Sequence, residues 1–200
     1  MSADAYGRFM GRYSEPLARM FVDLTGVAPG DRVLDVGSGP GALTAALVER
    51  LGSDAVAAID PSLPFVEALR DRLPGVDVLH GAAEVLPFPD DTFDAALAQL
   101  VVQFMSDPVA GLAEMKRVAG PGAVVAASVW DHGTGRGPLS SFWDAVRAWE
   151  AGAGMPASGC LVRRAGVLVV MGLPRCLSEI GPAEDPTGWL FAVMRVVLRP

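Results

Sequence analysis

A glycine-rich turn decides the fold of this chain, and it reads Val33-Leu34-Asp35-Val36-Gly37-Ser38-Gly39-Pro40-Gly41. The residues before the glycines predict a short strand, and Leu43, Leu47 and Leu51 after them share one face of a predicted helix. Glycines at such a strand-to-helix turn permit positive φ angles and let a ligand approach the backbone closely. Asp60 ends the next predicted strand, where a carboxylate can accept hydrogen bonds from both hydroxyls of a ribose. The pattern therefore predicts a nucleoside-binding loop.

Strands and helices alternate along the first 130 residues. Short β-rich or apolar runs predict strands at 32–37, 54–60, 76–79, 93–100 and 123–129. Amphipathic runs predict helices between them, at 42–51, 62–73 and 108–119, and before them from Ser14 to Leu24. Such alternation implies right-handed crossovers and a parallel sheet covered on both faces. We therefore predict an α/β fold with an open, doubly wound, mostly parallel sheet, which binds ligands at the carboxyl ends of its strands.

The carboxylate of Asp35 selects among nucleoside ligands. Gly37, Gly39 and Ala42 could satisfy the spacing of a dinucleotide-binding loop. However, Asp35 lies two residues before Gly37, where its charge would repel a pyrophosphate and attract an ammonium group. S-adenosylmethionine fits this preference, because it carries an amino group and a sulfonium and no phosphate.

Several stretches in sequence order carry a family resemblance. They are 35–41, Ala58-Ile59-Asp60-Pro61-Ser62, 81–88, Phe93-Asp94-Ala95-Ala96, 101–108, 114–118 and Pro121-Gly122. Together they resemble the motifs of class I S-adenosylmethionine-dependent methyltransferases, and most closely the type 11, ubiquinone/menaquinone-biosynthesis-like branch, which methylates small molecules. The resemblance covers about residues 6–150.

The resemblance implies a set of binding residues for S-adenosylmethionine. Asp35 with the glycine loop would hold the methionine part, Asp60 the ribose, and the Ala83 backbone the adenine. The implied cofactor-binding residues are Asp35, Gly37, Ser38, Gly39, Gly41, Asp60, Pro61, Ala83, Glu84 and Gln99. Gln99 would lie near the sulfonium, at the end of the fourth strand.

Two features depart from or extend this pattern. Ala82 occupies a position where the family often has an aspartate for the adenine amino group, which removes a hydrogen bond worth about 0.5–1.5 kcal/mol. In related enzymes the N-terminal segment closes over the cofactor. Tyr6, Arg12 and Tyr13 are therefore lid candidates, or else ordinary packing residues.

The last quarter of the chain does not match the family. Residues 151–200 contain both cysteines and, unlike residues 1–150, more basic than acidic side chains. Val167–Met171 and Leu190–Leu198 could form the final two strands of the sheet. We therefore divide the chain into a methyltransferase core, 1–150, and an atypical or truncated C-terminal segment, 151–200, which leaves open a non-catalytic relative that binds S-adenosylmethionine.

The expected chemistry is direct displacement at the sulfonium methyl, catalysed mainly by positioning a small-molecule or lipid-like acceptor in line with the C–S bond. No catalytic base is evident, and His132 is a candidate that loop placement alone would also explain. Trp130, Phe142, Trp143 and Trp149 could line an apolar acceptor pocket or simply pack a late helix.

Composition excludes other classes of function. The chain has 200 residues, 51% of them apolar, with a formal net charge of −7, which disfavours a nucleic-acid partner. No Cys/His cluster has metal-ligand spacing, and no apolar run approaches the ~20 residues of a membrane helix. A short-chain dehydrogenase needs a Tyr-x-x-x-Lys pair, but Leu112 stands four residues before Lys116, the single lysine. Without a secretory signal pattern, we expect a cytoplasmic protein with no stable membrane insertion.

Overall fold

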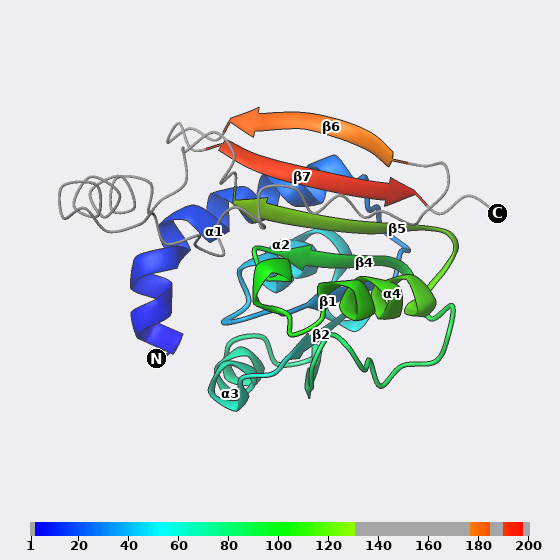
Figure 1. Cartoon of the computed structure of the whole chain (residues 1–200). Coiled ribbons are helices and arrows are strands. Elements are labelled where there is room, and N and C mark those ends of the chain that lie inside the picture. Colours follow the sequence, from blue (N-terminus) through cyan, green and yellow to red (C-terminus); the bar gives the residue numbers. More distant parts are fainter. Residues whose placement is uncertain (1–2, 131–176, 185–189, 198–200) are drawn as a thin grey trace, which may run out of the picture.

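Seven strands form one sheet at the centre of the molecule (Figure 1). The computed structural model describes the backbone of residues 3–130, 177–184 and 190–197, and the side chains of residues 10–129. The strands are β1 (Val33–Val36), β2 (Val56–Asp60), β3 (Asp77–His80), β4 (Phe93–Gln99), β5 (Ala119–Trp130), β6 (Leu177–Glu184) and β7 (Leu190–Val197), in the order β3-β2-β1-β4-β5-β7-β6. β1 to β5 are parallel, and β7 runs antiparallel to β5 and β6. The predicted α/β fold is confirmed.

The central strands are apolar and buried along their length. Every residue of β1 and of β2 is buried, as expected for strands covered by helices on both faces. β1 pairs with β2 on one side and with β4 on the other, with Val33 opposite both Val56 and Ala95. The chain order reverses beside β1, and ligands of open α/β sheets bind at this switch point, beyond the carboxyl ends of the strands.

Among the described residues, four helices cover the two faces of the sheet. They are α1 (Ala3–Thr25), α2 (Ala42–Leu51), α3 (Leu63–Arg72) and α4 (Pro108–Val118), with short 3₁₀ turns at Ser53–Ala55 and Val102–Phe104. Phe21 of α1 and Leu47 of α2 join one core cluster on the same face of the sheet. Met115 and Val118 of α4 pack on the opposite face, so that in Figure 1 α4 lies in front of the sheet and α2 behind it.

The first helix begins earlier than the sequence predicts. Ser14 with the following glutamate and proline predicts an N-terminus, yet α1 begins at Ala3 and holds both Ser14 and Pro16 in its interior. This prediction is wrong because a proline signals a helix start only where the backbone before it is not already helical. Pro16 lacks the amide that would bond the carbonyl of Arg12, and such a gap kinks a helix. Figure 1 shows α1 changing direction along its length.

The C-terminal strands complete the sheet. β7 coincides with the strand that the sequence places at Leu190–Leu198, while β6 is Leu177–Glu184, a segment that the sequence pattern missed. Its pairing with β7 shifts between Ile180 and Ala183, around a Gly-Pro pair that hides the period of the strand. The other candidate strand, Val167–Met171, and the expected helix after residue 140 lie outside the described residues.

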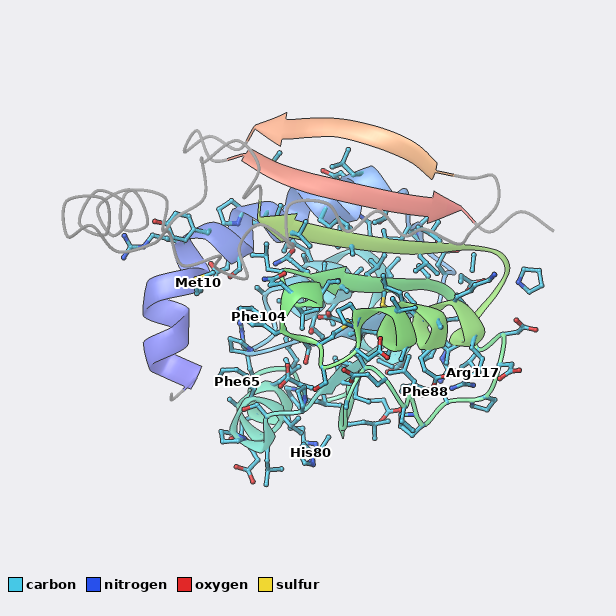
Figure 2. All side chains as sticks on the ribbon, in the orientation of Figure 1. Met10, Phe65, His80, Phe88, Phe104 and Arg117 are labelled. Atoms are coloured by element: carbon cyan, nitrogen blue, oxygen red, sulfur yellow. The ribbon has the colours of Figure 1, made fainter. Side chains whose placement is uncertain are left out.

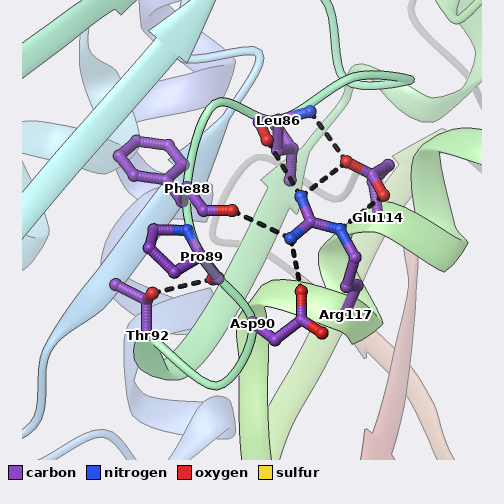
Figure 3. A network of polar contacts seen from close by, with 7 residues as sticks. All are labelled: Leu86, Phe88, Pro89, Asp90, Thr92, Glu114 and Arg117. Atoms are coloured by element: carbon purple, nitrogen blue, oxygen red, sulfur yellow. Dashed lines mark hydrogen bonds and ion pairs between the residues drawn. The ribbon is translucent and has the colours of Figure 1, made fainter.

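The long loop between β3 and β4 is held against α4 by one arginine (Figure 3). The guanidinium of Arg117 donates to the carbonyls of Leu86 and Phe88 at 2.9 and 2.8 Å, and to the carboxylates of Asp90 and Glu114 at 2.7–2.8 Å. Glu114 in turn accepts from the backbone amide of Leu86 at 2.9 Å. These contacts fix a segment without regular structure that leads into β4, near the amino ends of β4 and β5.

Candidate functional site

The glycine loop turns sharply at the end of β1. Gly37, Gly39 and Gly41 have φ angles of 74°, 53° and 91°, in the left-handed region that favours glycine. The amides of Gly37 and Ser38 both donate to the carbonyl of Ile59, at 2.8 and 3.1 Å, which ties the loop to the end of β2. A Cβ atom on Gly37 would collide with Val101, whereas one on Gly39 would meet no atom within 4 Å. Gly39 therefore leaves its side of the loop open for a ligand.

Asp35 presents one free carboxylate oxygen at this loop. Asp35 is 1% exposed. Its Oδ2 accepts a 2.6 Å hydrogen bond from the hydroxyl of Thr44, and its buried Oδ1 has no partner. Burial raises the pKa of Asp35 to about 7, the Thr44 hydroxyl opposes that rise, and the nearby charge of Asp60 adds to it. A buried, acceptor-only oxygen without a donor is the group expected opposite a ligand ammonium.

Asp60 connects the end of β2 to the glycine loop. Its Oδ2 accepts from the amide of Gly39 and its Oδ1 from the amide of Ser62, both at 2.8 Å. Burial raises the pKa of Asp60, while the Ser62 and Gly39 amides and His80 pull it down. His80 bonds the carbonyl of Pro61 at 2.9 Å and lies at the outer edge of the sheet (Figure 2). Each carboxylate oxygen of Asp60 retains a further lone pair, which suits it to accept from ribose hydroxyls.

The exit of β4 is strained and carries a second unpartnered acceptor. Gln99 donates its amide group to the carbonyl of Ser14 in α1 at 3.0 Å, and its buried Oε1 has no partner. Leu100 follows with a φ of 58°, rare for a leucine, and its amide bonds the carbonyl of Ser128 at 2.8 Å. Ser128 lies opposite Gln99 in β5, and its own buried hydroxyl also lacks a partner.

These groups surround one pocket at the switch point of the sheet. It is lined by Ser14, Asp35, Gly37, Ser38, Gly39, Pro40, Ala42, Leu43, Gln99 and Leu100. Among the described residues, four buried side-chain atoms lack a hydrogen-bond partner: Asp35 Oδ1, Ser38 Oγ, Gln99 Oε1 and Ser128 Oγ. Three of the four belong to residues that line this pocket, and Ser128 is the neighbour of one of them. The pocket therefore contains unpartnered polar groups, and these are mainly acceptors.

The structure brings half of the predicted binding residues together in this pocket. Asp35, Gly37, Ser38, Gly39 and Gln99 line it, and Asp60 is attached to it through the Gly39 amide. Gly41 caps α2, and Pro61 lies outside the pocket with its carbonyl on His80. Ala83 is 9% exposed and packs in the core beside Gly111.

One oxygen of Glu84 serves the fold. Its Oε1 accepts from the amides of Ser106 and Asp107, at 2.7 and 3.1 Å, and the Asp107 amide is the main cause of its lowered pKa. The contacts of Glu84 and Ala83 with an adenine stay predictions.

The lid and acceptor candidates are only partly described. Arg12 lies 5.8 Å from the ring centroid of Tyr13, and Tyr13 packs with Leu17 and Leu100 beside the pocket. The side chains of Tyr6 and Trp130 lie outside the described residues, as do His132, Phe142, Trp143 and Trp149.

Sequence reasoning missed two polar residues of the site. Thr44 shares the buried face of α2 with Leu43 and Leu47, and Ser128 interrupts a run of apolar residues in β5. A polar side chain on an otherwise apolar buried face was the available signal in both cases, because such a side chain needs a partner.

A protein-family model described as "Methyltransferase domain" matches residues 34–127, from β1 to β5. This part of the chain is similar to a methyltransferase domain. The matched residues include the glycine loop, Asp35, Asp60 and the exit of β4.

The chain is also similar in sequence or in fold to known proteins. The demethylmenaquinone methyltransferase of Renibacterium salmoninarum is 37% identical over 116 residues, which is 58% of this chain and 48% of that protein. A crystal structure of an S-adenosylmethionine-dependent methyltransferase from Aquifex aeolicus superposes with a TM-score of 0.64, at 21% identity, over 98% of this chain and all of that one. The [4+2]-cyclase SpnF is 29% identical over 57% of this chain and 44% of its own, with a TM-score of 0.53.

The chain spans about half the length of the curated relative described above. Within the described part of the chain, no helix is long and apolar enough to cross a membrane, and no group of three or more metal-binding side chains occurs.

Proposed function

We propose that this protein transfers the methyl group of S-adenosylmethionine to a small-molecule acceptor. The observation that carries the proposal is the buried Asp35 carboxylate, which lines a pocket formed by the glycine loop and whose Oδ1 has no hydrogen-bond partner. An ammonium group there would supply the missing donor and would be attracted by the charge in a poorly solvated site.

The other ends of S-adenosylmethionine match neighbouring groups. The ribose hydroxyls would donate to Asp60, which already braces Gly39 at the rim of the pocket. The adenine would extend toward the loop after β3, where the Ala83 backbone and Glu84 are its predicted neighbours. Gln99 Oε1, at the end of β4, would turn the negative end of its amide dipole toward the sulfonium.

The transfer itself is a displacement at carbon. A nucleophilic atom of the acceptor forms a bond to the methyl carbon as the C–S bond breaks, and the electron pair of that bond returns to sulfur, giving S-adenosylhomocysteine. The proton on the acceptor passes to solvent, or is already lost if the acceptor is an ionised phenol. The protein would contribute mainly by holding the two reactants in line, a type of catalysis that can supply about 7–11 kcal/mol.

The acceptor is proposed to be a hydroxylated aromatic compound. The support is the demethylmenaquinone methyltransferase relative, together with the net charge of −7, which disfavours a polyanion. Ser128 Oγ lies near the carboxyl end of β5, where a hydroxyl of the acceptor could replace its missing partner.

Calorimetric titration of S-adenosylmethionine tests the first half of the proposal. We expect binding by the wild-type protein, a loss of at least about tenfold in affinity for Asp35→Ala, and no change for Asp71→Ala. Asp71→Ala is the matched control because it removes the same charge from an exposed position of α3. No binding by the wild type would refute the proposal, and equal binding by Asp35→Ala would refute the assignment of Asp35.

A second function, binding of S-adenosylmethionine without methyl transfer, is favoured by one observation. Among the described residues that line the pocket, Asp35 is the single ionisable one. Because Asp35 would bind the ammonium, no described lining residue is left to act as a base. The chain is also similar to a [4+2]-cyclase, which is a further reason to test methyl transfer separately from binding. Transfer of labelled methyl to hydroquinones, phenols or fatty acids would support the methyltransferase, and binding without any transfer would support the alternative.

A further inference from the structure

We infer that Thr44 is a positioning residue for the ammonium of the substrate: its hydroxyl holds Asp35 by Oδ2, so that Oδ1 remains free on the pocket side. This inference rests on the proposed function, because it assigns a role within the same site. Thr44 is completely buried, and its hydroxyl donates to Asp35 at 2.6 Å, a length typical of a bond to an ionised acceptor.

The fold places the hydroxyl of Thr44 next to Asp35. It stands in the first turn of α2, directly after the glycine loop, and Gly41 caps that helix without any side-chain hydrogen bond. The N-terminal end of a helix carries a partial positive charge, so it favours the ionised form of a nearby carboxylate. Asp35 projects from β1. A hydrogen bond from Thr44 of α2 reaches its Oδ2, whereas its Oδ1 has no partner.

This arrangement sets the charge on Asp35. Burial favours the protonated form, and the Thr44 hydroxyl is the main group opposing that effect. Among the described groups that face Asp35 from the packed elements, Asp60 of β2 carries charge, and it disfavours a second negative charge nearby; Ser14 of α1 and Gln99 of β4 are neutral. Removal of the hydroxyl would therefore leave a carboxylate that is more often protonated at neutral pH and that binds an ammonium less well.

Two ligands separate this role from a merely structural one. S-adenosylhomocysteine has the ammonium, whereas 5′-methylthioadenosine has the same adenine and ribose but lacks the amino-acid part. Thr44→Val keeps the shape of the side chain and removes the hydroxyl, and Thr44→Ser keeps the hydroxyl. We would measure the affinity of both ligands by calorimetry from pH 6.0 to 8.5 for the wild type and both variants.

We expect Thr44→Val to bind S-adenosylhomocysteine about tenfold more weakly at pH 7 and to bind 5′-methylthioadenosine as the wild type does. We also expect the rise in S-adenosylhomocysteine affinity with pH to move to higher pH in Thr44→Val and to return to the wild-type position in Thr44→Ser.

Two outcomes would overturn the inference alone. One is an unchanged S-adenosylhomocysteine affinity and pH profile in Thr44→Val. The other is an equal loss for both ligands, which would make Thr44 a structural residue. Failure of the wild type to bind either ligand is a different result, and it would overturn the proposed function itself.

Discussion

The buried carboxylate of Asp35 should cost this protein stability at neutral and alkaline pH. In an unfolded chain the aspartate ionises near 3.8, whereas burial raises its pKa to about 7 in the folded protein. Between these two values the folded state holds a proton that the unfolded state has released, so the free energy of unfolding falls as pH rises. Below 3.8 the penalty is absent, and above about 8 it is constant.

The size of this effect follows from the shift. A rise from 3.8 to about 7 corresponds to a full penalty of about 4 kcal/mol, of which about 2.5 kcal/mol develops between pH 5 and pH 8. In Asp35→Asn this titration is absent, while the amide can still accept from Thr44. We therefore expect Asp35→Asn to gain about 2.5 kcal/mol relative to the wild type on going from pH 5 to pH 8.

Urea unfolding followed by circular dichroism at half-unit pH steps measures the difference. We compare how the free energy of unfolding changes from pH 5 to pH 8. The new amide needs its own hydrogen-bond partner and shifts that free energy by the same amount at both pH values, so its effect cancels. Asp71→Asn serves as the control, since this exposed acid should give the wild-type slope. Parallel curves for the wild type and Asp35→Asn would refute the idea that Asp35 is buried with a raised pKa.

Three further predictions concern the loop, the ribose site and the glycine turn. Arg117→Met should lower the free energy of unfolding by about 2 kcal/mol, because two backbone carbonyls and Glu114 lose charged donors, with Arg117→Lys intermediate; equal urea midpoints would contradict this. Asp60→Asn should weaken S-adenosylhomocysteine and 5′-methylthioadenosine alike in calorimetry, and a loss confined to the first would contradict a ribose role. Gly37→Ala should unfold several degrees lower in a thermal melt, because its φ is 74° and its new Cβ would collide with Val101; an unchanged midpoint would show that the loop can shift.

Asp35 and Thr44 illustrate how a binding site can oppose stability. In the part of the chain that the structure describes, four buried polar atoms without partners cluster around one pocket and its neighbour in β5, although such atoms are rare in folded proteins. A bound ligand that supplies donors would stabilise the folded state by mass action, and thermal shifts with S-adenosylhomocysteine would report that gain.

Much of the parallel part of the fold was predictable because its signals are local. The glycine turn, the buried runs of β1 and β2, and the acid that ends β2 each lie within a few residues of chain. The start of α1 was not predictable in this way, since Ser14 and Pro16 form a good N-terminal signal that helical residues upstream override. The strand β6 escaped detection because Gly181 and Pro182 interrupt its alternation, and it forms only by pairing with β7.

By itself, the sequence determined the class of fold and the position of the glycine loop, because strand periodicity and glycine φ angles are properties of short segments. It also predicted Asp35 and Asp60 as the acids of a nucleoside site. Only the tertiary structure decided how those acids are used. It buried Asp35 against α2, so that desolvation raises its pKa and Thr44 engages one oxygen. It also brought Gln99 of β4 to Ser14 of α1, 85 residues away in the chain. Burial and such long-range contacts depend on how the elements pack, and no short stretch of sequence contains that information.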